Sequence, residues 1–393
     1  MLATWTVCFA AVEFELSADQ TALESAAADL LDDLASAQRV REFVGPGTVT
    51  SEEQTDPSAG GFDRPLWEAM AEQGWLGVER PEAAGGLGLG MVEVAVLCEQ
   101  LGRRAAPAPF LGSILAMVAL QEAGVDEPVA PAVREATERW ADRLSAGDAV
   151  GCLVWAARPG TLTVRPVGDR WLLHGRPEPT LHADVADVAV VVTEDAVYAV
   201  DLEETGRPSA EPAMDRTRSL AWLRLAGTPA RRIGGGSAAA RLVDRAATGS
   251  AAELLGASAH VLEMSVEYAK VRRQFGHPVG SFQAVKHRLA DALVDVEAMR
   301  SCTYFAAWCS ASHDPEASLA ASMAKAWCSD ASQRVMASGM QVHGGIGFTW
   351  DHDLHLFLKR ARHDAAAFGT AAWHRDRIAG KLERRVAEGV SPL

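Results

Sequence analysis

The stretch over residues 268–291 reads YAKVRRQFGHPVGSFQAVKHRLAD. A helical pattern at its start gives way to a turn with a glycine at each end, residues 276–280, and then to a second helical pattern. We expect one helix to end at Arg273 and the next to begin near Ser281, which is a favourable N-cap residue. Two helices joined by a short turn are typical of a helix bundle.

Three side chains beside this turn are hydrogen-bond donors: Arg272, Gln274 and Gln283. Donors next to a turn and a helix start form a favourable site for a pyrophosphate group. The same residues also suit a helical hairpin with a polar elbow. The residues alone do not decide between these two interpretations.

A second stretch, residues 340–351, reads MQVHGGIGFTWD. Its glycines Gly344, Gly345 and Gly347 have no side chain, so another group can approach the backbone closely. The segment suits a nucleotide that lies on bare peptide, and it also suits a tight turn between two helices.

The rest of the chain divides into three regions around these stretches. Residues 1–147 have helical apolar periodicity, residues 148–236 alternate with the period of strands, and residues 237–393 are helical again. This order predicts an N-terminal all-α domain, a middle antiparallel β domain and a C-terminal four-helix bundle. The GGGS run at 234–237 predicts a flexible hinge. The expected helices are 19–44, 65–73, 91–101, 109–124, 128–145, 238–272, 282–311, 315–341 and 353–386, and the expected strands are 161–165, 171–174, 188–192, 197–200 and 220–225.

Composition and charge argue against some classes of partner and favour one cellular location. The formal net charge of −15 argues against a nucleic-acid partner, because phosphates attract basic surfaces. The six cysteines include no CxxC pair, so we expect free thiols in a reducing cytoplasm. Residues 1–14 lack the positive region of a signal peptide, and we expect them to be a disordered or edge segment. No stretch is apolar enough to cross a membrane, so we expect a cytoplasmic protein with no membrane partner.

Four histidines lie close together in the sequence: His343, His352, His355 and His363. They lack the ligand spacing of a metal site such as HExxH. We therefore expect no metal centre.

Three motifs carry a resemblance to a known family. YAKVRRQFG with SFQAVKHRLAD, QVHGGIGFTWDHDLHLFLKRA, and the N-terminal run GWLGVERPEAAGGLGLGMVEVAVLCEQLGR resemble the signatures of acyl-CoA dehydrogenases, in the family's order and over nearly the whole chain. The pattern is most similar to bacterial members found in steroid or specialised-metabolite catabolism. The resemblance implies the family's α–β–α fold.

The resemblance also implies FAD at an interface between subunits, and therefore a homo- or hetero-oligomer, a dimer or a tetramer. The implied substrate is an acyl-CoA or acyl-carrier-protein thioester, with an electron-transfer flavoprotein as the candidate acceptor. The positions that match the family's cofactor contacts are Arg272, Gln274 and Phe275 for the adenosine and pyrophosphate, Gln283 on the adenine side, Gln341, Gly344 and Gly345 toward a neighbouring subunit's FAD, and Thr370 near the cofactor.

The implied reaction is α,β-desaturation, in which a carboxylate removes the α-proton while the flavin accepts the β-hydride. The family's usual base position holds Phe368 here, which cannot take a proton. Glu253 lies where related bacterial members use a glutamate, and its helical neighbours are small, so it is our candidate base. Those small residues also suit close helix packing around an ordinary salt bridge. Asp364 is a weaker candidate that we expect on the surface.

The β region departs from the family's pattern. The family's run of flavin contacts is replaced by the stretch 154–160, and its strand beside the flavin ring is replaced by 177–181. The leading interpretation is an FAD-dependent acyl-CoA dehydrogenase that uses Glu253. One alternative is a partner subunit with an incomplete flavin site, which lends Gln341 and the glycines to another chain's FAD. Another is an oxidase, hydroxylase or reductase on the same fold.

Overall fold

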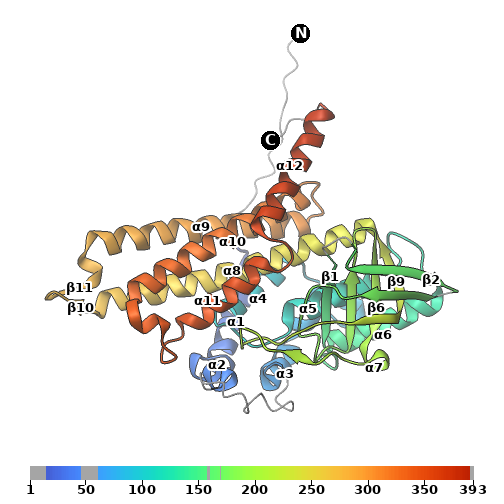
Figure 1. Ribbon diagram of the computed structural model, residues 1–393, viewed down its shortest axis with the longest axis horizontal. Helices are drawn as coiled ribbons and strands as arrows, with labels where there is room; N and C mark the ends of the chain where they lie inside the picture. The colour runs from blue at the N-terminus through green and yellow to red at the C-terminus, as the bar shows by residue number, and fades with distance from the viewer. Residues whose placement is uncertain (1–14, 46–60, 157–159, 169, 390–393) are drawn as a thin grey trace, which may run out of the picture.

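The computed structural model describes residues 15–45, 61–156, 160–168 and 170–389. A sheet and several helices lie at one side, and the long helices of a bundle extend away from them (Figure 1). The yellow helix α8 (Gly236–Val271) begins beside the sheet and reaches the far end of the bundle, so it joins both parts. The predicted N-terminal edge segment, and most of the stretch between the expected helices 19–44 and 65–73, lie outside the described residues.

The N-terminal region is helical, as predicted. Ser17 and Gln20 form a reciprocal capping box at the start of the first helix. The single helix expected over 19–44 is two helices, because Ser36 between them has extended backbone (ψ 155°). The helices here are α1 (Ala18–Leu34), α2 (Ala37–Val44), α3 (Arg64–Glu72), α4 (Met91–Arg103), α5 (Phe110–Gln121) and α6 (Pro131–Ser145), with short 3-10 turns at Trp75–Gly77 and Glu82–Ala84.

The central sheet is six-stranded, in the order β1-β5-β6-β9-β3-β2. The predicted antiparallel arrangement holds for every neighbouring pair in it except β1 and β5, which run parallel. Both β1 and β5 are apolar runs covered on both faces, which is typical of parallel strands. The strands are β1 (Gly151–Trp155), β2 (Leu162–Val167), β3 (Arg170–Gly175), β5 (Val188–Val192), β6 (Ala196–Asp201) and β9 (Leu225–Gly235), and a second, three-stranded sheet holds β4 (Thr180–Leu181), β8 (Leu220–Ala221) and β7 (Ala210–Glu211). A one-turn helix, α7 (Leu202–Thr205), follows β6.

The predicted hinge at 234–237 is wrong. Gly234 and Gly235 belong to β9 and pair with β6, and Gly236 is the first residue of α8. The strand therefore passes directly into the helix. The predicted domain boundaries lie between α6 and β1 and in the first turn of α8.

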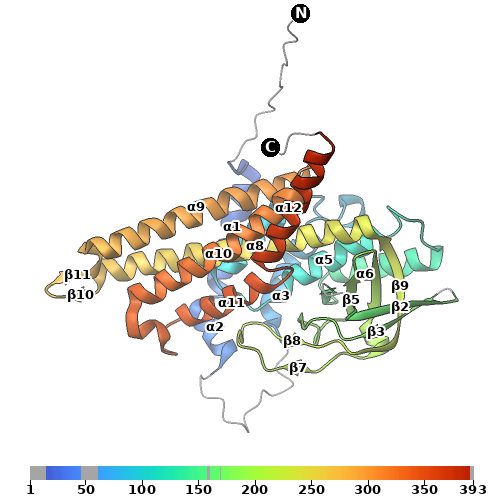
Figure 2. The same cartoon turned by 45° about the horizontal axis from the view of Figure 1, so that its top comes forward.

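The bundle contains α8, α9 (Gln283–Ala311), α10 (Ala317–His343), α11 (Leu354–Ala366) and α12 (Ala371–Ala387). Figure 2 shows α8, α9 and α10 side by side, and α12 turned away from α11. The expected last helix, 353–386, is thus two helices, because Phe368 has positive φ (54°) and Thr370 starts a new helix as its N-cap. The expected N-cap Ser281 is also wrong: α9 starts after Phe282. Between α8 and α9 the chain forms a tight hairpin of β10 (Arg273–Gln274) and β11 (His277–Pro278), and a 3-10 turn, η4 (Gly344–Phe348), follows α10.

Helices α4 and α8 approach each other through glycines. A Cβ placed on Gly256 would lie 1.9 Å from the backbone oxygen of Glu99. A Cβ placed on Gly102 would lie 2.2 Å from the backbone oxygen of Glu253. These glycines let the two backbones come together, which fixes the stretch of α8 that carries Glu253.

The structure also bears on the predictions about membrane-spanning helices and cysteines. None of the helices in the described residues is long and apolar enough to cross a membrane. Each cysteine from Cys98 to Cys328 is a free thiol, as predicted, whereas Cys8 lies outside the described residues.

Candidate active site

A cavity of about 260 Å³ lies where the sheet meets the bundle. One side comes from the start of α5 and from β1, and the other from α8 and the end of α11. Glu253, Asp364 and Phe368, the three residues that the sequence marked for the base position, all line it. The other lining residues are Ala108, Pro109, Phe110, Leu111, Gly112, Leu153, Trp155, Glu178, Pro179, Thr180, Leu181, His182, Arg218, Leu220, Ser250, His363, Ala366 and Ala367.

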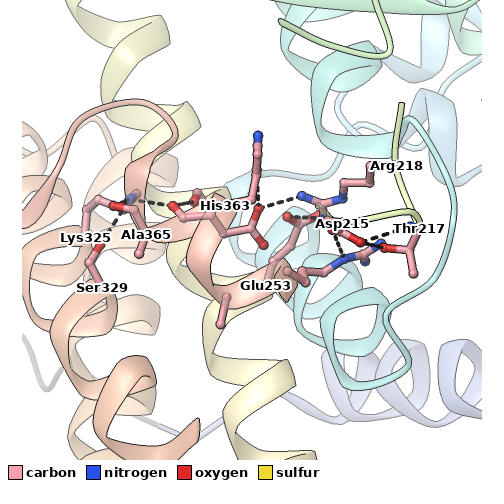
Figure 3. Close-up of polar contacts among 12 residues, drawn as sticks. Asp215, Thr217, Arg218, Glu253, Lys325, Ser329, His363 and Ala365 are labelled. Carbon is pink, nitrogen blue, oxygen red and sulfur yellow. Dashed lines mark hydrogen bonds and ion pairs between the residues drawn. The ribbon is translucent and has the colours of Figure 1, made fainter. Parts of the chain in front are cut away.

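A buried guanidinium joins two carboxylates at the cavity wall (Figure 3). Arg218 donates from Nη2 to Glu253 Oε2 and from Nη1 to Asp364 Oδ1, each at 2.6 Å. All three side chains are buried, so this arginine neutralises charge that water does not reach. Asp364 is therefore not the surface residue that the sequence predicted.

The two carboxylates titrate differently although they share one arginine. Burial disfavours the charged form of Asp364, but Arg218 and His363 outweigh that effect and lower the pKa of Asp364 to about 2. For Glu253 burial dominates and raises its pKa, even though Arg218 opposes the shift. A raised pKa suits a proton acceptor, whereas the bond from Arg218 occupies Glu253 Oε2.

A second buried arginine, Arg360, extends this network to residues that do not line the cavity. Arg360 donates to the backbone oxygen of Ala106 at 3.1 Å and to Asp215 Oδ2 at 3.4 Å, and it also bonds Thr217. The segment 215–218 is thereby tied to α11 and to the turn before α5. This fixed segment positions Arg218 beside the two carboxylates.

A buried lysine fixes the turn between α11 and α12. Lys325 is completely buried, and its Nζ donates to the backbone oxygens of Asp364 at 2.8 Å and of Ala365 and Gly369 at 3.2 Å (Figure 3). Burial lowers the pKa of Lys325 to about 8. Its bonds satisfy carbonyls at the C-terminal end of α11, which is where a helix attracts a cation. Lys325 thus holds the turn that carries Phe368.

Two indole rings meet beside the cavity. Trp155, at the end of β1, packs edge-on against Trp373 in the first turn of α12, with ring centroids 5.0 Å apart. Trp155 is the second residue of the stretch 154–160, which replaces the family's flavin contacts, and Trp373 follows Thr370 by three residues. Rings in direct contact leave no room for a flavin ring between them. This contact closes the space between the end of β1 and the first turn of α12.

The predicted cofactor residues other than Thr370 lie together elsewhere. Arg272, Gln274, Phe275 and Gln283 are at the β10–β11 hairpin and the start of α9, and Gln341, Gly344 and Gly345 are at the end of α10. The ring of Tyr268 stacks on His343 at 4.5 Å, which joins the ends of α8 and α10. Figure 1 places this end of the bundle remote from the sheet.

This end of the bundle is open on its outer side. Arg272, Gln274, Gln283 and Gln341 are exposed, and Phe275 is 88% exposed. A Cβ placed on Gly344 or Gly345 would meet no atom within 4 Å. Exposed donors and bare backbone fit the adenosine and pyrophosphate half of a dinucleotide. We name this group of residues the distal cradle.

Thr370 lies apart from the distal cradle. Its hydroxyl accepts from the backbone N–H of Trp373 at 3.3 Å, so it caps α12. Its place near the cofactor stays a prediction.

The sequence did not point to Arg218, Arg360 or Lys325. Apart from Ser329, which is four residues from Lys325, their hydrogen-bond partners in this network lie 35 to 254 residues away, so no local pattern marks these contacts. Among the three, only Lys325 has a local sign, because it is the one charged residue in the run 317–329. Among the described residues no group of three or more His, Cys, Asp and Glu side chains is placed to hold a metal ion.

Comparison with known proteins gives consistent matches over the chain. Residues 32–130 match the family model "Acyl-CoA dehydrogenase, N-terminal domain", and residues 234–383 match "Acyl-CoA dehydrogenase, C-terminal domain". The chain is 36% identical to acyl-CoA dehydrogenase IpdE2 of Mycobacterium tuberculosis over 84% of its own length and 89% of that protein.

Two solved structures are similar to the whole fold. The ChsE4-ChsE5 complex of Mycobacterium tuberculosis matches with a TM-score of 0.83 and 28% identity, over 96% of this chain and 99% of that one. The Tcur3481-Tcur3483 steroid ACAD matches with a TM-score of 0.81 and 28% identity, over 94% and 99%. Both are named as pairs of proteins.

Proposed function

Because the chain belongs to the acyl-CoA dehydrogenase family of FAD-dependent oxidoreductases, we propose that it is one subunit of a two-protein acyl-CoA dehydrogenase. In this assembly its distal cradle binds the FAD of the other subunit, and the other subunit's pocket carries out the α,β-desaturation. The alternative that the sequence left open, an incomplete partner subunit, thus becomes the leading proposal.

The contact between Trp155 and Trp373 carries this proposal. It joins β1 and α12 at 5.0 Å, in the place where the family's pattern has flavin contacts. A flavin ring bound between β1 and the first turn of α12 would have to separate two packed indoles. The distal cradle has no such obstruction, because a Cβ at Gly344 or Gly345 would meet open space.

The bundle surface supports an assembly. Large apolar side chains are exposed on α9, on η4 and on α10, where a partner would cover them. Leu293 and Val294 are exposed on α9, Trp327 on α10 and Phe348 on η4. The similar structures named as pairs of proteins give independent support. The steroid name of one of them supports a bulky, steroid-derived acyl thioester as substrate.

When bound, FAD accepts the hydride from the β-carbon of the thioester. The residues of this chain bind the FAD and orient it. Arg272 supplies a fixed cation for the pyrophosphate, and Gln274 and Gln341 supply neutral donors. Phe275 offers an exposed ring for stacking.

We expect Gln341→Ala and Gly345→Val to remove FAD from the assembly without dissociating it. The chain would be purified together with a second acyl-CoA dehydrogenase chain that copurifies with it, and the flavin absorbance would be measured relative to the amount of protein. Loss of a donor or of the open backbone should lower FAD affinity about tenfold or more. Gln38→Ala on α2 is the matched control. Unchanged flavin content in both cradle variants would contradict the proposal.

A second candidate function keeps the chemistry in this chain, with Glu253 as the base. Its position in the cavity wall and its raised pKa favour this candidate. If it holds, Glu253→Gln lowers kcat of acyl-CoA desaturation at least a hundredfold. Glu267→Gln, an exposed change on the same helix, should leave kcat unchanged. Full turnover per FAD in Glu253→Gln would assign the chemistry to the partner.

A further inference from the structure

Two cysteines on neighbouring helices of the bundle bring their sulfur atoms into contact. The Sγ atoms of Cys302 on α9 and Cys328 on α10 lie 3.9 Å apart, although the residues are 26 positions apart in the sequence. Both residues are free thiols. A disulfide bond is about 2.0 Å long, so the two sulfurs need to approach by about 1.9 Å to form one.

The packing of α9 on α10 allows this approach. The two helices are joined by residues 312–316 and lie side by side (Figure 2). Within one turn of the two cysteines, Ala306 on α9 and Ala324 and Ala331 on α10 are completely buried. Such small side chains let helices pack closely. A change of rotamer at the partly exposed Cys302 moves its sulfur without moving either helix.

The two thiols differ in a way that suits a two-step oxidation. Cys302 is partly exposed, whereas Cys328 is completely buried. A hydrogen bond from Cys328 lowers the pKa of Cys302, and burial raises the pKa of Cys328. Thr303 Oγ1 lies 3.4 Å from Cys328 Sγ and helps to hold that sulfur in place. An accessible thiol with a lowered pKa, next to a second thiol, is typical of an oxidation-sensitive cysteine with its resolving partner.

We propose that Cys302 and Cys328 form a reversible disulfide that fastens α9 to α10 when the protein meets hydrogen peroxide or an organic hydroperoxide. The Cys302 thiolate attacks a peroxide oxygen, the O–O bond breaks, and Cys302 becomes a sulfenic acid as water or an alcohol leaves. The Cys328 sulfur then attacks the Cys302 sulfur. The S–S bond forms, the S–O bond breaks, and the hydroxyl leaves as water with the Cys328 proton. The two thiols lose two electrons, and the peroxide gains them.

Mass spectrometry of tryptic peptides tests the proposal with an internal control. Trypsin separates residues 301–325, which contain Cys302 and Cys309, from residues 326–334, which contain Cys328. The full-length protein is treated with hydrogen peroxide, and its remaining thiols are blocked with N-ethylmaleimide before digestion. In the folded protein the Cys302–Cys328 link should be at least about tenfold more abundant than the Cys309–Cys328 link, because the sulfurs of the first pair are already in contact. In urea the two links should agree within about twofold, since they close loops of similar length.

A second measurement tests whether the bond fits the folded bundle. A disulfide restricts the unfolded chain, so the oxidised protein should unfold at a higher urea concentration than the reduced protein. Dithiothreitol should reverse this increase. Cys302→Ser should abolish both the link and the increase, whereas Cys309→Ala, on the same helix, should retain both.

Three results would each overturn the proposal. They are oxidation of Cys302 to a sulfinic or sulfonic acid without the link, similar amounts of the two links in the folded protein, and a urea midpoint that does not rise on oxidation. If Cys302→Ser does not fold, the ratio of the two links in the unaltered protein still decides the question.

Discussion

Replacing Arg218 with leucine is expected to destabilise the protein by about 3–5 kcal/mol, because it leaves buried carboxylates without their cation. Arg218 bonds both Glu253 and Asp364 at 2.6 Å, and its side chain is almost fully buried. Leucine fills part of the volume but supplies no charge. The free energy of unfolding from urea titration measures the loss.

The loss of unfolding free energy in Arg218→Leu should be smaller at acidic pH. Without the arginine, the folded carboxylates have pKa values above their unfolded values, so the folded variant binds more protons than the unfolded chain. Stability of the variant then falls as pH rises, and the deficit is larger at pH 7 than at about pH 5. Arg224→Leu, an exposed arginine six residues later, is the control and should stay within about 0.5 kcal/mol. A loss below about 1 kcal/mol in Arg218→Leu, or one that is constant with pH, would show that the network is not what we describe.

Gly256→Ala is expected to destabilise the protein by about 3 kcal/mol, although alanine is the better helix former. The new Cβ would lie 1.9 Å from the backbone oxygen of Glu99 and 2.8 Å from the backbone nitrogen of Arg103. Backbone atoms cannot rotate away, so α4 has to shift from α8. The shift would also disturb Glu253, which packs against Gly102 on the same interface.

Gly380→Ala on α12 provides a control of opposite sign. A Cβ there would meet nothing within 4 Å, so only the helix propensity changes. That change should stabilise the protein by up to about 1 kcal/mol. Thermal unfolding of both variants separates the two effects. If Gly256→Ala were neutral or stabilising, the close approach of α4 and α8 would be contradicted.

Most elements of the fold could be predicted from periodicity. The helices of the N-terminal region and of the bundle, and the hairpin of β2 and β3, follow their apolar patterns. Strand β1 escaped prediction because it is buried on both faces and has no alternation. The break at Ser36 was missed because neither glycine nor proline marks it. The break before α12 did have a signal, since Gly369 precedes the N-cap Thr370.

The site was predictable only in part, because its chemistry depends on distant partners. Glu253 was found through the resemblance and does line the cavity. The salt bridge that the sequence offered as the alternative for Glu253 exists, but its partner is the buried Arg218 from the β region. Gly256 serves close helix packing, which was also the alternative. The contact of Trp155 with Trp373 joins two regions more than 200 residues apart, so only a three-dimensional structure reveals it.

The most direct test of the central claim is the visible absorbance spectrum of this chain purified alone, with and without added FAD. If its own pocket is closed to the flavin ring, the protein should be colourless, should not be reconstituted by FAD, and should acquire flavin only together with its partner subunit. Oxidised-flavin bands at one FAD per chain, in the protein purified alone, would contradict the account.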